Sequence, residues 1–187
     1  MRISRNTLHR NWLWSTLAAV LAAGVLGALD TQLKLLSGAG TADLQDFATA
    51  GQFEAAFHVW GVHAWLSRAG FNLGFDYLFM PLYALSFFYS GVVVLDTFAL
   101  RAGLLRRLLG MALLAPVLAA GLDAVENALE LTMLWNGPTD GLAAIAHTVS
   151  TAKWVGIVIG FALLAGAILA RVQAWQKGRL QGLNPSP

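Results

Sequence analysis

Residues 115–135 read APVLAAGLDAVENALELTMLW, an apolar run long enough to cross a membrane but interrupted by polar groups. The interruptions, Asp123, Glu126, Asn127 and Glu130, are spaced i, i+3, i+4 and i+7, so they share one face of a helix. A carboxylate at the centre of a bilayer costs about 2.5–3.5 kcal/mol on insertion scales. Three carboxylates on one face must therefore be paired, protonated or wetted by a cavity, which makes this acidic face a candidate site.

The composition of the whole chain is that of an integral membrane protein. Of its 187 residues, 57% are hydrophobic and 12% are charged, whereas soluble domains are roughly 25% charged. The mean hydropathy is +0.62 and the pI is near 9.3. Because the basic residues lie beside the apolar runs, they indicate membrane topology and predict no nucleic-acid partner. The chain has no cysteine, which excludes disulfides and thiolate metal sites.

Four long apolar segments predict an all-α fold, a four-helix transmembrane bundle that forms one membrane domain over residues 1–187. We expect the spans at about residues 12–36, 75–100, 105–135 and 142–172. Each is longer than the ~20 residues that a helix needs to cross the hydrocarbon core. Pro81 and Pro116 lie inside two of the spans and should kink them. The tail, residues 178–187, is expected to be disordered.

Basic residues mark one side of the predicted bundle. Nine of the 12 Lys and Arg residues precede the first span, follow the last span or lie between the second and third. The positive-inside rule therefore places both termini in the cytoplasm. Residues 1–27 also resemble a secretory signal, with a candidate cleavage site at Val25-Leu26-Gly27. Cleavage there would leave three spans and would not move the acidic face.

The loop between the first two spans, residues 41–69, is predicted to be an amphipathic helical segment on the outer side. Its aromatic residues are interleaved with acidic residues and histidines, which favours one or two helices lying on the membrane surface or over the bundle. Glu54 and His58 are four residues apart and could pair, or bind a metal ion with His63 or His147. Histidines on a solvated face are the simpler interpretation, so we predict no metal site.

The last two spans are joined by a short turn, residues 136–141, and should be antiparallel neighbours. Residue numbers at equal depth then sum to about 277. Glu130 is then at the depth of His147. Glu126 and Asn127 are at the depth of Thr151 and Ser150, and Asp123 is at the depth of Lys153 and Trp154. The polar face of the fourth span is expected to carry His147, Ser150, Thr151 and Trp154, with Lys153 partly off it. A lysine and a histidine therefore come beside the acidic face.

Charge counting indicates that this site is not neutral by itself. The three carboxylates, with Asp76 of the second span as a fourth, meet one lysine and at most one charged histidine. Either a carboxyl group stays protonated, or a cation or cationic ligand completes the site. The candidate ligand-binding residues are Asp76, Tyr83, Asp123, Glu126, Asn127, Glu130, His147, Thr151 and Lys153. A purely structural interpretation is that such groups join helices, as Asn127 with Ser150, at only ~0.6 kcal/mol for each hydrogen bond.

Two groups of residues carry a resemblance. One comprises Phe47-Ala48-Thr49-Ala50, Trp60-Gly61 and Phe75-Asp76-Tyr77-Leu78-Phe79 with Tyr83, and the other comprises Leu122-Asp123-Ala124-Val125-Glu126-Asn127 and Ala152-Lys153. Over roughly residues 44–160 the chain resembles a family of small bacterial four-span membrane proteins, known to us only as uncharacterised. The resemblance implies a four-helix fold and a multi-pass position in the bacterial inner membrane. It implies no activity.

Three functions fit these residues. The first is a membrane-embedded site, open toward the outer side, that binds a small or amphipathic ligand with Asp123 and Glu126 as proton-exchanging groups. The second is an intramembrane enzyme that uses the same carboxyl groups for acid–base chemistry on a lipid-like substrate. The third is an accessory or assembly subunit of a larger membrane complex, with small-residue stripes on the first and fourth spans as its contact faces. A homodimer is expected only if the protein transports its ligand, because four helices are few for a transporter. Nucleotide-binding and hydrolase motifs are absent, so no cofactor is expected.

Overall fold

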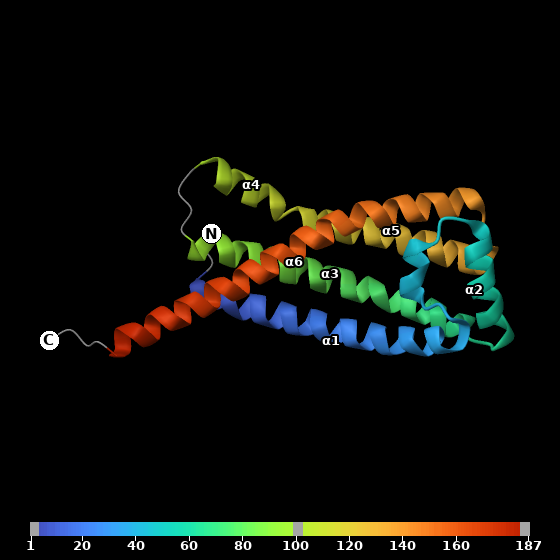
Figure 1. The fold of residues 1–187 in the computed structure, drawn as a ribbon, viewed down its shortest axis with the longest axis horizontal. Helices are drawn as coiled ribbons and strands as arrows, with labels where there is room; N and C mark the ends of the chain where they lie inside the picture. The colour runs from blue at the N-terminus through green and yellow to red at the C-terminus, as the bar shows by residue number, and fades with distance from the viewer. Residues whose placement is uncertain (1–3, 99–102, 184–187) are drawn as a thin grey trace.

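The computed structural model describes residues 4–98 and 103–183, with side chains as far as residue 176, and this part of the chain contains helices and no strand. The long helices are α1 (Arg5–Ser37), α3 (Leu66–Thr97), α5 (Ala115–Asn136) and α6 (Asp140–Leu183). The shorter ones are η1 (Thr41–Asp46), α2 (Ala50–Val62) and α4 (Leu104–Ala112). Figure 1 shows the long helices side by side, with η1 and α2 across one end, which we call the capped end. The predicted all-α four-helix bundle is confirmed.

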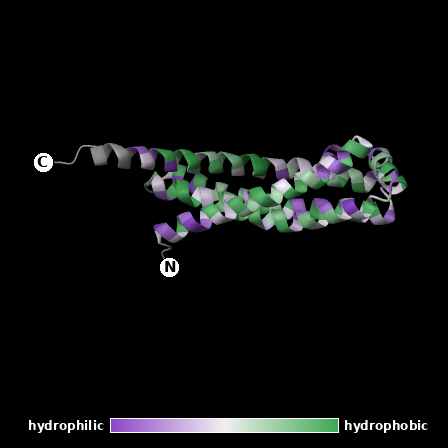
Figure 2. Cartoon of the chain, turned by 90° about the horizontal axis from the view of Figure 1, so that it is seen from below, coloured by the Kyte–Doolittle hydropathy of each residue, from purple (hydrophilic) through white to green (hydrophobic). Residues whose placement is uncertain are grey.

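The helices that are long and apolar enough to cross a membrane are α1, α3, α4 together with α5, and α6. Large apolar side chains such as Trp14, Leu21 and Val158 are exposed on the outside of the bundle. Figure 2 shows hydrophobic residues along the length of the bundle and hydrophilic ones gathered toward its two ends. This distribution is that of a multi-pass membrane protein, in which lipid covers the apolar exterior.

Several helix ends differ from the sequence-based bounds. α3 begins at Leu66 and therefore includes part of the segment that we expected to belong to the outer loop. The third span is broken at Leu113 and Leu114, because Pro116 at the start of α5 lacks an N–H and collides with the preceding turn. Pro81 is accommodated inside a continuous α3. α6 is helical as far as Leu183, so the expected disorder is wrong for residues 178–183, and residues 184–187 lie outside the described part.

Contacts between α1 and α3 include polar bridges as well as apolar packing. Trp12 Nε1 donates to Ser90 Oγ at 2.8 Å, and the hydroxyls of Thr16 and Ser86 lie 2.8 Å apart. Such bonds satisfy polar side chains that would otherwise face hydrocarbon. At the end of the bundle away from η1 and α2, Asp96 of α3 pairs with Arg5 of α1 at 3.1 Å.

The path of α6 depends on two glycines. α6 leaves the turn beside α5 and crosses α3 obliquely toward the opposite end of the bundle (Figure 1). A Cβ at Gly156 would lie 2.5 Å from the Ala115 carbonyl oxygen, and a Cβ at Gly160 would collide with the Phe87 ring. The Gly156–Gly160 stripe is therefore used for packing within this chain.

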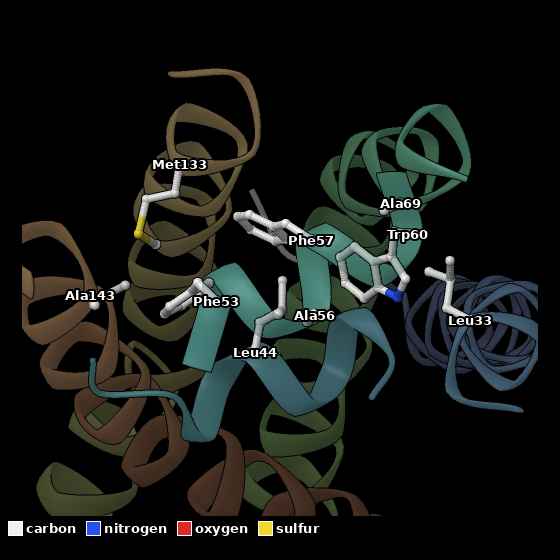
Figure 3. Packing of buried hydrophobic residues seen from close by; sticks show 10 residues of the cluster. Leu33, Leu44, Phe53, Ala56, Phe57, Trp60, Ala69, Met133 and Ala143 are labelled. Atoms are coloured by element: carbon white, nitrogen blue, oxygen red, sulfur yellow. The ribbon is translucent and has the colours of Figure 1, made fainter. Parts of the chain in front are cut away.

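η1 and α2 pack over the end of the bundle, which is one of the two arrangements that the sequence allowed. Phe53 and Trp60 of α2 are fully buried against residues that include Leu33 and Met133, as Figure 3 shows. Trp60 Nε1 donates to Ser37 Oγ at 2.8 Å, and the Ala50 N–H donates to Asp140 Oδ1 at 2.8 Å. These contacts tie α2 to α1, α5 and α6 at once.

The short helix η1 is fixed to α1 by charged groups. Lys34 Nζ lies 2.7 Å from Asp43 Oδ1, and the Gly40 N–H donates to Asp43 Oδ2 at 2.8 Å. Partial burial would raise the pKa of Asp43, but these two donors hold it below its usual value. η1 is therefore held over the bundle by an ionised carboxylate.

Candidate functional site

The centre of the acidic face is an ion-paired cluster that joins α5 to α6. Lys153 Nζ lies 2.7 Å from Asp123 Oδ1 and 2.6 Å from Glu126 Oε2. All three side chains are buried, with Lys153 only 3% exposed. The antiparallel register that placed Asp123 level with Lys153 therefore describes the structure well. A lysine between two carboxylates leaves this cluster with one negative charge when all three groups are ionised.

The two carboxylates of this cluster differ in their hydrogen bonds. Asp123 also accepts a hydrogen bond from Tyr83 Oη of α3, at 3.0 Å, so it is held from two helices. Neither oxygen of Glu126 accepts a hydrogen bond of good geometry, although Oε2 is within ion-pair distance of Lys153. Glu126 is therefore the less satisfied of the two groups.

Asn127 lies on the side of α5 that faces α3. Its Nδ2 donates to Asp76 Oδ2 at 2.8 Å and to the Leu73 carbonyl oxygen at 3.1 Å. The alternative in which Asn127 joins Ser150 of α6 is therefore wrong. Successive residues of a helix point about 100° apart, so Asn127 cannot share the direction in which Glu126 faces α6.

Two buried oxygen atoms near this cluster have no partner. Glu130 is 1% exposed, and its Oε1 accepts no hydrogen bond. Asn72 of α3 is 2% exposed, and its Oδ1 is also unpaired. Asn72 Nδ2 donates to Thr41 Oγ1 at 2.5 Å, and Thr41 in turn donates to Asp30 Oδ1 at 3.0 Å. Because the Thr41 proton is used on Asp30, Thr41 must accept from the Asn72 amide group, which leaves Asn72 Oδ1 as the free acceptor.

Two adjoining cavities, each of about 200 Å³, open beside these groups. The first lies between α1, η1, α3 and α5, and its polar lining includes Asp30, Asn72 and Glu130. The second lies between η1, α3, α5 and α6, and its lining includes Asp123 and Lys153. Gln45, Asp76 and Phe79 line both. Asp76 therefore stands where the two cavities meet, and Gln45 of η1 contributes to both from the capped end.

His147 and Thr151 are not brought into this site. His147 is half-buried, and its Nδ1 lies 3.3 Å from the Gln45 carbonyl oxygen. Thr151 is exposed, and its hydroxyl donates to the carbonyl of His147 at 3.0 Å. Of the expected polar face, Ser150 is buried and Trp154 lines the second cavity, and Lys153, expected partly off that face, is buried as well. The prediction misplaced the inward face of α6 by a rotation about the helix axis. Counting residues from the turn predicts how deep a side chain lies, but not toward which neighbouring helix it points.

Glu54, His58 and His63 of the capped end do not come together as a cluster. Glu54, His58 and His63 are exposed. Within the described residues no ion pair joins Glu54 to His58, and no three His, Asp or Glu side chains lie close enough to hold a metal ion. The alternative in which Glu54 and His58 pair is therefore wrong.

Several residues that line the cavities were not among the candidates from the sequence, including Asp30, Gln45, Asn72 and Phe79. A signal for Asn72 was present, because Asn72, Asp76 and Tyr83 are spaced so that they share one face of α3. Gln45 carried no such signal, since its position depends on how η1 folds over the bundle.

Comparison with known proteins gives no assignment: no family model, no curated protein and no solved structure matches the chain. The site itself must therefore carry the functional argument.

Proposed function

We propose that this protein binds a small or amphipathic ligand, with coupled proton exchange, in the membrane-embedded site formed by α3, α5 and α6. The observation that carries the proposal is the pair of cavities that meet at Asp76 beside four carboxylates and one lysine. A site that served only to join helices would bury its polar groups against each other. Here polar groups line open volume, and buried oxygen atoms such as Glu130 Oε1 and Asn72 Oδ1 have no hydrogen-bond partner among the residues that the structure describes.

Each polar residue has a distinct part in this proposal. Asp123 and Glu126 exchange protons as ligand enters, and Lys153 is their counter-ion. Tyr83 and Asn127 fix the directions of the Asp123 and Asp76 carboxylates through the hydrogen bonds described above. Glu126 is the better candidate for proton exchange, because its oxygens lack the hydrogen bonds that stabilise ionised Asp123.

We place the protein in the bacterial inner membrane as a multi-pass protein, with both termini in the cytoplasm and the capped end outside. The start of α1 and the last turns of α6 lie toward the same end of the bundle (Figure 1), where Arg5 and Arg171 are also found. This arrangement supports the positive-inside orientation. The ligand site then lies in the outer half of the membrane, and η1 and α2 restrict access to it from outside.

The test is native mass spectrometry of protein that is purified gently from its own membranes. We expect wild type to carry a bound small molecule or lipid that Glu126→Gln loses. Glu54→Gln is the matched control, because it makes the same substitution at an exposed position of α2 and should retain the ligand. If wild type carries no ligand, or if Glu126→Gln keeps it, the proposed function is wrong.

A role as accessory subunit is the second candidate, and the surface of α1 favours it. The stripe expected on the first span is Ala19, Ala23 and Gly27. Ala19 is buried within the chain, but Ala23 and Gly27 are exposed and a Cβ at Gly27 would meet no neighbouring atom, so this part of the stripe is open to another helix. The stripe on α6 is already occupied by α3 and α5 of the same chain, which leaves one free face and not two. A heterologous protein that co-purifies with wild type in the absence of a ligand would favour this role.

A further inference from the structure

We infer that the first cavity receives the cationic, N–H-bearing head of an amphipathic ligand and that the second cavity receives part of its apolar body. The inference rests on the proposed function and names the class of ligand. The ligand would be a protonated amine or a guanidinium attached to an apolar group, in contact with Glu130 and Asn72 at one end and with aromatic rings at the other.

The unpaired oxygens call for a hydrogen-bond donor. Glu130 Oε1 and Asn72 Oδ1 are both more than nine-tenths buried, both lack a partner, and both residues line the first cavity. A buried acceptor without a donor costs about 1–3 kcal/mol. An ammonium group carries three donors and no acceptor, so one such group could serve both oxygens and Asp76 beside them.

The charge of the first cavity points to the same ligand. Asp30, Asp76 and Glu130 line it, and none of the described residues that line it is Lys, Arg or His. Lys153 compensates them only in part, since its ammonium group is already paired with Asp123 and Glu126. A ligand with an anionic head would meet like charge, whereas a cation would reduce the surplus.

The spacing of these carboxylates suits an organic cation. A metal ion needs its ligands to converge at one point within about 2.0–2.6 Å. No three described acidic or histidine side chains converge in that way. Instead they are distributed around a cavity of about 200 Å³, which has room for an ammonium group with several carbon atoms.

The second cavity provides the apolar surface. Phe79, Phe87, Ile157 and Phe161 line it, and the rings of Phe87 and Phe161 meet edge to face at 5.1 Å. Trp154 and Phe161, also in this lining, are 47% and 56% exposed, so the cavity opens through the outside of the bundle between α3 and α6. In a membrane that opening faces lipid, and an amphipathic amine could enter sideways with its charged end leading toward Asp76.

The experiment uses the full chain in nanodiscs of phosphatidylcholine and three probes that share an eight-carbon chain. Octylamine offers a charged head with N–H groups, octyltrimethylammonium offers charge without N–H, and octanol offers neither charge nor N–H. Binding is measured by native mass spectrometry and by the shift of thermal unfolding. We expect octylamine to bind at least tenfold more tightly than the other two probes.

Variants locate the binding. Glu130→Gln and Asp76→Asn should each weaken octylamine binding at least tenfold, whereas Glu54→Gln should leave it unchanged. Two variants are used so that a folding defect in one of them cannot be mistaken for a loss of the binding site. Equal binding of octyltrimethylammonium or octanol would overturn the N–H requirement, and wild-type affinity in both variants would overturn the location.

The result is separable from the test of the proposed function. A natural ligand that is lost in Glu126→Gln, together with no preference for octylamine, would leave the proposed function standing and refute the cationic ligand. No natural ligand and no octylamine binding would refute both.

Discussion

At the scale of single residues, the unusual feature is a lysine buried between two carboxylates inside a membrane-spanning bundle. Among the side chains that the structure describes, Lys153 is the only buried cation. Its two partners are on α5, so one ammonium group fixes both the level and the rotation of α6 against α5. Removing one partner from a buried ion pair leaves an uncompensated charge, which is more costly than never having had the pair.

We therefore predict that Lys153→Met lowers the free energy of unfolding by about 3–5 kcal/mol. The substitution keeps an unbranched apolar side chain, one atom shorter, but removes the ammonium group between Asp123 and Glu126. Lys34→Met is the matched control, because Lys34 pairs with Asp43 at the surface and should matter far less. Unfolding in mixed micelles, followed by tryptophan fluorescence, measures both. Equal losses of unfolding free energy in the two variants would show that the buried ion pair stabilises the fold no more than the surface pair does.

At the scale of helices, the sequence predicted levels better than directions. Apolar length and the short turn were enough to predict four spans and the meeting of Asp123 with Lys153, because both follow from counting residues along an axis. The face of α6 was predicted only in part: Ser150 is buried and Trp154 lines the second cavity, but Thr151 is exposed and His147 lies beside Gln45 outside the cavity linings. Rotation is decided by close packing, here at Gly156 against the Ala115 carbonyl, and a lone sequence does not show which glycine will touch a neighbour.

The same contact gives a prediction for helix packing. Gly156→Ala should lower the free energy of unfolding by about 1–3 kcal/mol, because the added methyl group meets backbone that cannot move aside cheaply. Gly121→Ala is its control, since a Cβ there meets nothing within 4 Å and should stabilise α5 by up to about 1 kcal/mol. Thermal unfolding of the two variants tests the difference in sign. Stabilisation by both would mean that α6 does not pack closely at Gly156.

At the scale of the whole molecule, the bundle is closed at one end and extended at the other. η1 and α2 cover the end of the four-helix bundle where the cavities lie. The sequence of residues 41–69 could not predict this packing, because its amphipathic pattern suits a position on the membrane surface equally well. α6, with 44 residues, is about 66 Å long. It is therefore much longer than the ~30 Å hydrocarbon core, and its last turns project past the other helices (Figure 1).

The absence of cysteine from the natural sequence allows a direct test of orientation. Gly51→Cys at the start of α2 and Gln176→Cys near the end of α6 each place one thiol at an exposed position. We predict that a membrane-impermeant maleimide labels the first in spheroplasts, whereas the second is labelled only after the membrane is permeabilised. The reverse pattern would mean that the capped end faces the cytoplasm.

The buried pair between α5 and α6 also bears on biosynthesis. Lys153 follows Glu130 by 23 residues, so α5 leaves the ribosome with three carboxylates before their counter-charge has been made. Each carboxylate opposes release into lipid by about 2.5–3.5 kcal/mol if it lies near the bilayer centre. We expect the nascent α5 to remain at the translocon until Lys153 emerges, and the two helices to enter the bilayer together as a hairpin.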